Sequence, residues 1–206
     1  MINNHWNNLH KKYSDKDWKN KPSLFAETVC EYLPSKGKIL ELGAGLGQDS
    51  LFFAMQGYGV TSTDLSIDYL KNISNTKNIE VSQVDLSNEL PFKKESYDVV
   101  YAHLSLHYFD AQTTKRIFKD IYSVLKSNGV LAFFTNSIDD PEYGTGVFIE
   151  PDYFKTSGTQ KRYFNVETAT KFAHHFKPLL VDNNGETYKD RQKGVHNLIR
   201  FIGVKI

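Results

Sequence analysis

The sequence predicts an α/β fold with a doubly wound, seven-stranded and mostly parallel sheet, whose last strand is antiparallel and whose two faces carry helices. Two observations support this prediction. Short runs rich in β-branched and aromatic residues alternate with segments of helical spacing, and a glycine turn at 43–47 directly follows the first run. Such alternation is typical of parallel βαβ units. Because 206 residues suit one domain, we expect a single domain over 1–206.

The N-terminal half alternates helices and short strands. Pro22 and Ser23 open a stretch of helical apolar spacing that ends before Pro34. The glycine turn separates the first strand from the next helix, and Gly57 and Gly59 flank the turn into the second strand. We expect helices at 22–33, 48–56 and 66–73, and strands at 38–42, 60–63 and 79–84.

The C-terminal half continues this alternation with one long interruption. We expect strands at 97–103, 130–135, 179–186 and 195–204, and helices at 111–125 and 166–176. Ser127-Asn128-Gly129 is predicted to close the helix at 111–125. The last two strands are expected to form an antiparallel hairpin at the sheet edge. Residues 137–160, rich in Gly, Pro and Asp, are predicted to be an irregular segment on the substrate side.

Composition narrows the class of protein. The formal net charge of +1 gives no reason to expect a nucleic-acid partner. No run of 18 apolar residues and no signal-peptide core is present, so no membrane span is expected. Cys30 is the only cysteine, which excludes an internal disulfide and is consistent with a reducing compartment. We therefore expect a cytoplasmic protein, and no His and carboxylate spacing predicts a metal site.

The glycine turn indicates a bound ligand. Gly43, Gly45 and Gly47 lie between a strand and a helix, where backbone N–H groups are expected to point outward and a ligand can approach closely. A dinucleotide fingerprint of the form G-x-G-x-x-G would need a third glycine at position 48, which is Gln48. The spacing therefore argues against a nicotinamide cofactor.

Acidic residues stand at the ends of the first three predicted strands. Because ligands of open α/β sheets bind outside the carboxyl ends of the strands, Glu41, Asp64 and Asp85 are expected to share one edge. Asp64 suits the two hydroxyls of a ribose, and Asp85 with Leu86 suits an adenine ring. A single strand-end Asp is more often a helix cap, but three behind a glycine turn favour a nucleoside.

These motifs resemble those of the class I S-adenosylmethionine-dependent methyltransferases. The resemblance rests on the glycine turn behind Glu41, on Thr63-Asp64-Leu65, on Asp85-Leu86, and on the segments 97–104 and 125–130. Within the class, the chain is similar to the small-molecule branch that includes tellurite-resistance and thiopurine methyltransferases. It implies a Rossmann-like methyltransferase fold, S-adenosyl-L-methionine as cofactor and a small-molecule acceptor. Ala102-His103-Leu104-Ser105 lacks the Asn/Asp-Pro-Pro-aromatic motif of many nucleic-acid amine methyltransferases.

The resemblance also implies site residues. Gly43 and Gly45 would face the methionine part of the cofactor, and His103 would lie beside the sulfonium. The implied cofactor site comprises Glu41, Gly43, Ala44, Gly45, Asp64, Leu65, Asp85, Leu86 and His103. The candidates for a general base or other catalytic group are His103, His107 and Tyr108, with His196 on the last strand as a further histidine. His107 and Tyr108 could equally be packing residues, and His196 is better explained as a polar face position.

Alternatives stay open at this point. The N-terminal residues 1–35 are expected to form a helical cover, in which Trp6, Tyr13 and Trp18 either fold over the cofactor or fill an ordinary apolar seam. We expect a monomer or a weak homodimer. The leading prediction is an enzyme that methylates a small molecule. The rivals are a non-catalytic cofactor-binding protein and a nicotinamide-dependent oxidoreductase.

Overall fold

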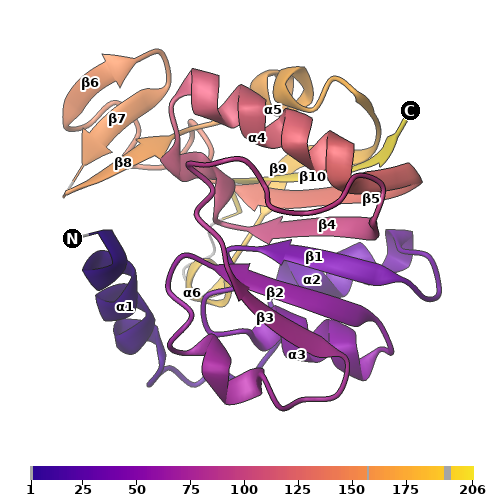
Figure 1. Cartoon of the computed structure of the whole chain (residues 1–206). Coiled ribbons are helices and arrows are strands. Elements are labelled where there is room, and N and C mark those ends of the chain that lie inside the picture. The colour runs from indigo at the N-terminus through magenta and orange to yellow at the C-terminus, as the bar shows by residue number, and fades with distance from the viewer. Residues whose placement is uncertain (1, 157, 193–195) are drawn as a thin grey trace.

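The computed structural model describes residues 2–156, 158–192 and 196–206. Its main sheet has seven strands in the order β3-β2-β1-β4-β5-β10-β9 (Figure 1). The strands of this sheet are β1 (Lys38–Leu42), β2 (Gly59–Asp64), β3 (Ile79–Gln83), β4 (Tyr97–His103), β5 (Leu125–Thr135), β9 (Phe176–Gly185) and β10 (Leu198–Lys205). The helices are α1 (Ile2–Tyr13), α2 (Leu24–Val29), α3 (Gln48–Met55), α4 (Ala111–Val124), α5 (Val166–Phe172) and α6 (Tyr188–Arg191).

The pairing confirms the predicted fold class. The pairs β1–β2, β2–β3, β1–β4 and β4–β5 are parallel. Strand β10 is antiparallel to both of its neighbours, β5 and β9, so the last strand is the antiparallel one. The predicted strand at 195–204 corresponds to β10, although Val195 lies outside the described residues.

Two hydrophobic cores lie on opposite faces of the sheet. Because side chains alternate along a strand, β5 sends Leu131 and Phe133 to one face and Ala132 and Phe134 to the other. Helices α4 and α5 cover the first face, and α2 and α3 cover the second (Figure 1). The apolar stripe of α4, including Ile117 and its neighbours one turn on, packs in the first core.

Three predicted helix boundaries are wrong. The helix expected at 166–176 ends at Phe172, and β9 already begins at Phe176. The segment 66–73 contains only a 3₁₀ turn, Leu70–Ile73, and at its start the Ser66 amide donates to the Asp64 carboxylate instead of opening a helix. Ser127-Asn128-Gly129 does not close a helix, since β5 begins at Leu125 directly after α4. The turn is instead absorbed within β5 by Asn128, whose φ is 61°, at a register shift against β4.

The segment 137–160 is not irregular throughout, which corrects the prediction. It contains β6 (Val147–Glu150), β7 (Tyr153–Thr156) and the start of β8 (Thr159–Arg162), which form a separate antiparallel sheet. The sequence pattern concealed β6 because Val147, Phe148 and Ile149 are consecutive and all exposed, so the strand lacks the usual alternation of apolar and polar residues.

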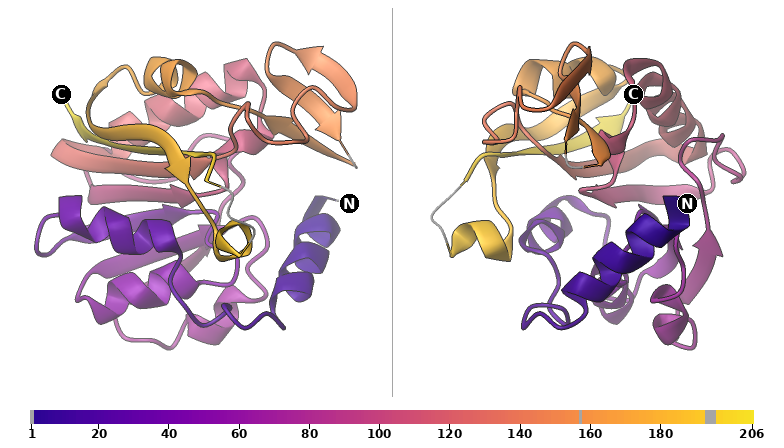
Figure 2. Two further views of the ribbon diagram at one scale, coloured as in Figure 1. Left: turned by 180° about the vertical axis from the view of Figure 1, so that it is seen from behind. Right: turned by 90° about the vertical axis from the view of Figure 1, so that its left-hand side faces the viewer.

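Two elements lie beside the carboxyl ends of the central parallel strands. Helix α1 lies near β1 and β2, and the β6–β8 sheet lies near β4 and β5 (Figures 1 and 2). These two elements leave one edge of the main sheet, between α1 and the small sheet, as the place to look for a site.

Among the described residues, no helix has both the length and the apolar character needed to cross a membrane.

A substitution in the glycine turn tests how tightly this edge is packed. Gly43 has a φ of 77°, and a Cβ on it would overlap the Cβ of Ser105, which cannot move without its backbone. Gly57 has a φ of 94° and open space where a Cβ would stand, so it isolates the backbone cost. We expect Gly57→Ala to lower the free energy of unfolding by about 1 kcal/mol, and Gly43→Ala by about 2–4 kcal/mol because overpacking is added. Urea denaturation measures both, and equal losses would contradict the close packing of Ser105.

Candidate active site

The backbone of the glycine turn is hydrogen-bonded to the end of strand β2. Gly43, Gly45 and Gly47 all have positive φ, at 77°, 58° and 80°. The amides of Gly43 and Ala44 both donate to the Thr63 carbonyl at 2.8 Å, and the Gly47 amide donates to the Ala44 carbonyl at 2.9 Å. The expectation that the turn amides point outward is therefore wrong for these residues, because the end of β2 and the turn itself accept their hydrogen bonds.

Asp64 is the link between the turn and the end of β2. Its carboxylate accepts from the Gly45 amide at 2.9 Å through one oxygen and from the Ser66 amide at 2.9 Å through the other. The side chain is buried, and each carboxylate oxygen keeps capacity for a further donor. A diol could therefore bind Asp64 without displacing the backbone contacts, as the sequence predicted for a ribose.

Glu41 lies beneath the turn rather than beside its open face. It is 2% exposed, and the Ser50 hydroxyl donates to its carboxyl group and also contacts the Ser62 hydroxyl at 2.6 Å. Burial, followed by repulsion from Asp49, raises the pKa of Glu41 to about 8. The residue predicted to contact a cofactor is thus a buried, protonated group that is hydrogen-bonded to Ser50 of α3.

Asp49, at the start of α3, is a buried residue that the sequence reasoning missed. Its carboxylate accepts from the Ser23 amide at 2.6 Å, the Ser23 hydroxyl at 2.8 Å and the Tyr101 hydroxyl at 2.7 Å. These bonds join the start of α2, the start of α3 and strand β4. The signal available in the sequence was an acidic residue in the first turn of a helix, which is usually a solvated position.

The predicted adenine end lies along β2 and β3. The Val84 amide donates to the Asp64 carbonyl at 3.0 Å, which brings Asp64 and Asp85 to the same edge. Asp85 is half-buried and accepts from the Ser87 amide at 2.8 Å. Leu86 is 8% exposed within a hydrophobic core, so only a small part of it can touch a ring, while the half-buried Leu65 is more accessible.

His103 ends β4 on the face that carries α2 and α3. Its ring stacks on Phe134 with centroids 4.9 Å apart and an interplanar angle of 4°. Burial lowers the pKa of His103, opposed by the charge of Asp49, so the imidazole is neutral near pH 7. Two residues on, the Ser105 hydroxyl donates to the Leu42 carbonyl and joins this segment to the glycine turn.

His107 and Tyr108 lie on a short 3₁₀ turn, Leu106–Tyr108, next to the site. Burial lowers the pKa of His107 to about 3, helped by the charges of Lys161 and His103. Burial also raises the pKa of Tyr108 well above its usual range. A histidine with so low a pKa accepts protons poorly, which argues against His107 as the proton acceptor. His196 is not brought to this group, since its Nδ1 lies 2.8 Å from Glu186.

Two elements close over the 3₁₀ turn. Trp6 of α1 packs edge-on against Tyr108 with ring centroids 4.6 Å apart. From the small sheet, the Tyr153 hydroxyl donates to the Tyr108 carbonyl at 3.1 Å, and Arg162 donates to the Phe109 carbonyl at 3.1 Å. The predicted N-terminal cover and the predicted substrate-side segment thus both reach the candidate site.

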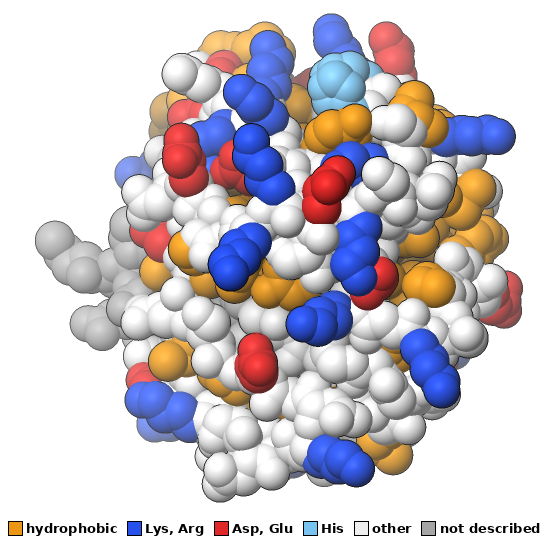
Figure 3. Space-filling view, turned by 45° about the vertical axis from the view of Figure 1, so that its right-hand side comes forward, with side chains coloured by type: hydrophobic (Ala, Val, Ile, Leu, Met, Phe, Trp, Pro, Cys, Tyr) orange, Lys and Arg blue, Asp and Glu red, His pale blue; other side chains and the backbone are white. Residues whose placement is uncertain are grey.

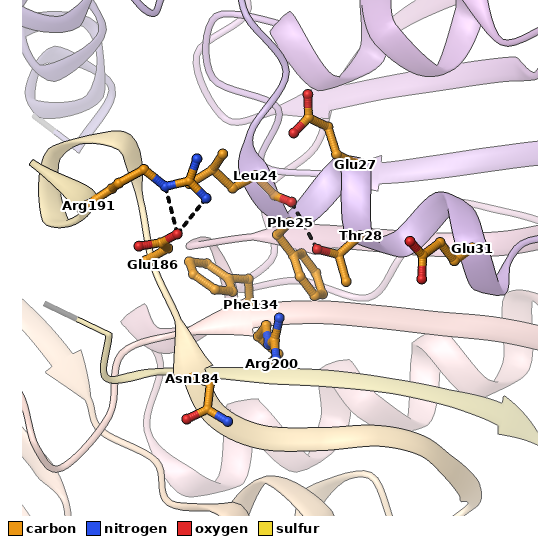
Figure 4. A pocket seen from close by; sticks show the side chains of 10 residues that line it. All are labelled: Leu24, Phe25, Glu27, Thr28, Glu31, Phe134, Asn184, Glu186, Arg191 and Arg200. Carbon is orange, nitrogen blue, oxygen red and sulfur yellow. Dashed lines mark hydrogen bonds and ion pairs between the residues drawn. The ribbon is translucent and has the colours of Figure 1, made fainter. Parts of the chain in front are cut away.

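A surface cavity of about 280 Å³ lies between α2 and the β9–α6 segment (Figure 4). Phe134, whose ring stacks on His103, forms part of its wall together with Phe25. Its arginines are already paired, Arg191 with Glu186 and Arg200 with Asp182. The cavity therefore reaches the ring beside His103, although it lies away from Asp64. Among the described residues, no group of three or more His, Cys, Asp or Glu side chains is arranged to hold a metal ion.

Residues 39–129 match the family described as "Methyltransferase domain". The YqeM protein of Bacillus subtilis, which carries the name of a methyltransferase, is 34% identical over 110 residues, 51% of this chain. The chain spans less than half of that relative, 44% of its length.

Two solved structures show the same fold. The Burkholderia thailandensis 1,6-didemethyltoxoflavin-N1-methyltransferase, bound to 1,6-didemethyltoxoflavin and S-adenosylhomocysteine, is 17% identical with a TM-score of 0.77, over 98% of this chain and 84% of that one. TehB of Haemophilus influenzae is 19% identical with a TM-score of 0.65, over 88% of this chain and 61% of that one. Identities this low establish the likeness of fold alone.

The buried carboxyl under the turn predicts a pH-dependent stability. Glu41 keeps its proton in the folded chain up to about pH 8 but loses it near 4.5 when unfolded. The contribution of Glu41 to stability is therefore complete below that lower pH and falls as the pH rises toward 8, by about 1.4 kcal/mol per unit. Glu41→Gln, which has no such proton to lose, should lack this part of the slope. Urea unfolding at pH 5, 6, 7 and 8 measures it, with exposed Glu80→Gln as control. An unchanged slope in Glu41→Gln would show that Glu41 is charged in the folded chain.

Proposed function

We propose that this chain, whose residues 39–129 match the family described as "Methyltransferase domain", transfers a methyl group from S-adenosylmethionine to a small-molecule acceptor. The observation that carries the proposal is the contact between the Gly45 amide and the Asp64 carboxylate. It places a buried carboxylate with free acceptor capacity directly beside a glycine turn, at the carboxyl edge of a parallel sheet. That arrangement suits a nucleoside with an extended polar arm.

The residues present fit this cofactor. Above Gly45, a Cβ would meet only the His10 side chain, at 3.6 Å, so side chains rather than backbone border that position. Asp64 would accept the ribose hydroxyls, Asp85 and Leu65 would flank the adenine, and Gly43 and Gly45 would allow close approach of the methionine part. The cofactor supplies an already activated methyl group on a sulfonium, so the chain's task is to bind, align and exclude water.

His103 is the proton acceptor in this proposal when the acceptor atom arrives protonated. Its lowered pKa keeps the imidazole neutral and able to accept a proton at Nδ1 or Nε2, and its flat stack on Phe134 fixes the ring plane. Helix α1 and the β6–β8 sheet cover Tyr108 from two sides and would keep water from the reacting atoms.

The acceptor is proposed to be a small molecule. The likeness of fold to the toxoflavin methyltransferase and to TehB supports the small-molecule branch that the motifs indicate. The face shown in Figure 3 intersperses Lys and Arg with Asp and Glu, which suits the net charge of +1 and gives little attraction for a polyanion. We also propose that the chain is a monomer or a weak homodimer. The presence of Cys30 alone fits a reducing, cytoplasmic location.

Calorimetry and a transfer assay test the proposal together. We expect S-adenosylhomocysteine to bind and NAD not to bind, and labelled S-adenosylmethionine to pass its methyl group to one of a panel of thiols, amines, phenols and tellurite. Binding without transfer to any acceptor would favour a non-catalytic binding protein. Tight NAD binding without S-adenosylhomocysteine binding would overturn the proposal in favour of an oxidoreductase.

Asp64→Ala tests the ribose contact. Losing a charged partner of two hydroxyls is expected to weaken S-adenosylhomocysteine binding by about 1–3 kcal/mol, or roughly 5- to 150-fold. Asp98→Ala is the matched control, because Asp98 pairs with Lys126 at the opposite, amino end of β4. Calorimetry on both variants decides the matter, since equal affinities would mean that the ribose is held elsewhere.

A further inference from the structure

The turn at 85–88 follows β3 and carries the acidic residue expected at the adenine. Within it, the Asp85 carboxylate accepts from the Ser87 amide at 2.8 Å, and the Asp85 carbonyl accepts from the Asn88 amide at 3.0 Å. Ser87 and Asn88 are exposed, so one side of the turn lies in solvent. The orientation of the Asp85 carboxylate is therefore tied to the conformation of the turn as a whole.

A single arginine of α4 bonds to this turn at two points. The Arg116 guanidinium donates to the Asn88 carbonyl at 2.6 Å through Nη1 and to the Leu86 carbonyl through Nη2. Because a guanidinium is planar and presents its N–H groups in a fixed fork, two simultaneous bonds restrict the positions of both carbonyls. The donor is also charged, which makes each bond stronger than one between neutral groups. Arg116 thus holds the turn from the side of α4.

The arginine is itself held in place. Asp120, one helical turn further along α4, pairs with Arg116 at 2.8 Å, and its carboxylate also accepts from the Leu90 amide at 3.4 Å. The Leu86 side chain is buried in the same hydrophobic core as Ile117 of α4. The segment that follows β3 is therefore joined to α4 by apolar packing and by a pair of charged side chains.

The loop proposed to flank the adenine on its other side is held in a comparable way. The Gln83 side chain, at the end of β3, donates from Nε2 to the Leu65 carbonyl at 2.8 Å. Each of the two loops thus has a backbone carbonyl that is bonded to a side chain of another element. Gln83 is neutral, exposed and makes one such bond, whereas Arg116 is charged and makes two, so Arg116 is the stronger anchor.

We propose that Arg116 is a positioning residue for base recognition, which holds the turn at 85–88 so that the Asp85 carboxylate accepts from the exocyclic amino group of the adenine. The inference rests on the proposed function, in which Asp85 flanks that ring. Arg116 acts through the turn and does not touch the base. A binding group is held precisely only when its supporting neighbours are fixed, so loosening the turn costs selectivity for the base.

Two ligands that differ at the base test this role. S-adenosylhomocysteine carries an amino group on its purine where S-inosylhomocysteine carries a carbonyl oxygen, and a carboxylate can accept only from the first. In calorimetry we expect the wild type to prefer S-adenosylhomocysteine by about tenfold or more, and Arg116→Ala to reduce this preference to less than about threefold. Exposed Lys119→Ala, on the same helix, should keep the full preference. A partly unfolded variant would bind less of both ligands and leave their ratio unchanged, so the ratio isolates positioning from folding.

Asp85→Ala provides the second measurement. It should remove the preference by itself, and Arg116→Ala in the same chain should then lower the preference no further, because both substitutions act on one contact. A further loss in the double variant, or a full preference in Arg116→Ala alone, would overturn the role of Arg116. Equal binding of both ligands by the wild type, or an unchanged preference in Asp85→Ala, would overturn the adenine contact and the role of Arg116 with it. If the wild type binds neither ligand, the proposed function itself fails.

Discussion

The hydrogen bond from the Gly45 amide to the Asp64 carboxylate is the contact on which the site depends. It fixes the glycine turn against the end of β2, and two further amides of the turn reinforce it by sharing the Thr63 carbonyl. The turn can make these bonds because Gly43 and Gly45 adopt a positive φ that other residues reach only with strain. The same hydrogen bond from Gly45 holds the Asp64 carboxylate in one orientation. The candidate site therefore has a carboxylate of fixed orientation beside the glycine turn.

Beneath that site, two buried carboxyl groups hold the secondary structure in register. Asp49 accepts three hydrogen bonds from Ser23 and Tyr101, so it is the fully bonded member of the pair. Glu41 has a serine partner and a carboxylate neighbour, and its raised pKa makes it the protonated member. Two negative charges this close in a buried site would repel strongly, and one proton removes the conflict. Burying these two carboxyl groups costs free energy. The hydrogen bonds that offset this cost for Asp49 join the start of α2, the start of α3 and strand β4.

The covers over the site are held differently from the sheet. The β6–β8 sheet is anchored by the buried Arg162, which bonds to the Phe109 carbonyl and pairs with Glu150. Helix α1 shows no comparable anchor among its described side chains, and none of them joins the cores. An element of low intrinsic stability next to a binding surface can open and close without disturbing the fold. The small sheet is therefore tied to the main fold by a buried arginine, whereas α1 lies against it outside the two cores.

Much of the fold was readable from the sequence. The strand limits at 38–42 and 97–103 follow from local runs of sheet-forming residues between clear turn signals, and the structure has the same limits. Short-range rules also located the turn and put Asp64 and Asp85 at one edge. Local pattern failed where the chain does not alternate: β6 is exposed on all of its apolar residues, and Asn128 places its turn inside a strand instead of after a helix.

What only the tertiary structure decided is the state and surroundings of each side chain. Sequence position made Glu41 an expected ligand contact, His107 either a candidate base or a packing residue, and the turn amides expected free donors. Packing between elements distant in the chain buried Glu41 on Ser50, lowered the pKa of His107 to about 3, and gave the amides partners in β2. It also set His10 above Gly45. Sequence by itself determines which residues stand at a strand end, because that depends on neighbours along the chain. Protonation and hydrogen-bond capacity depend on burial and on neighbours across space, which arise only when the elements pack.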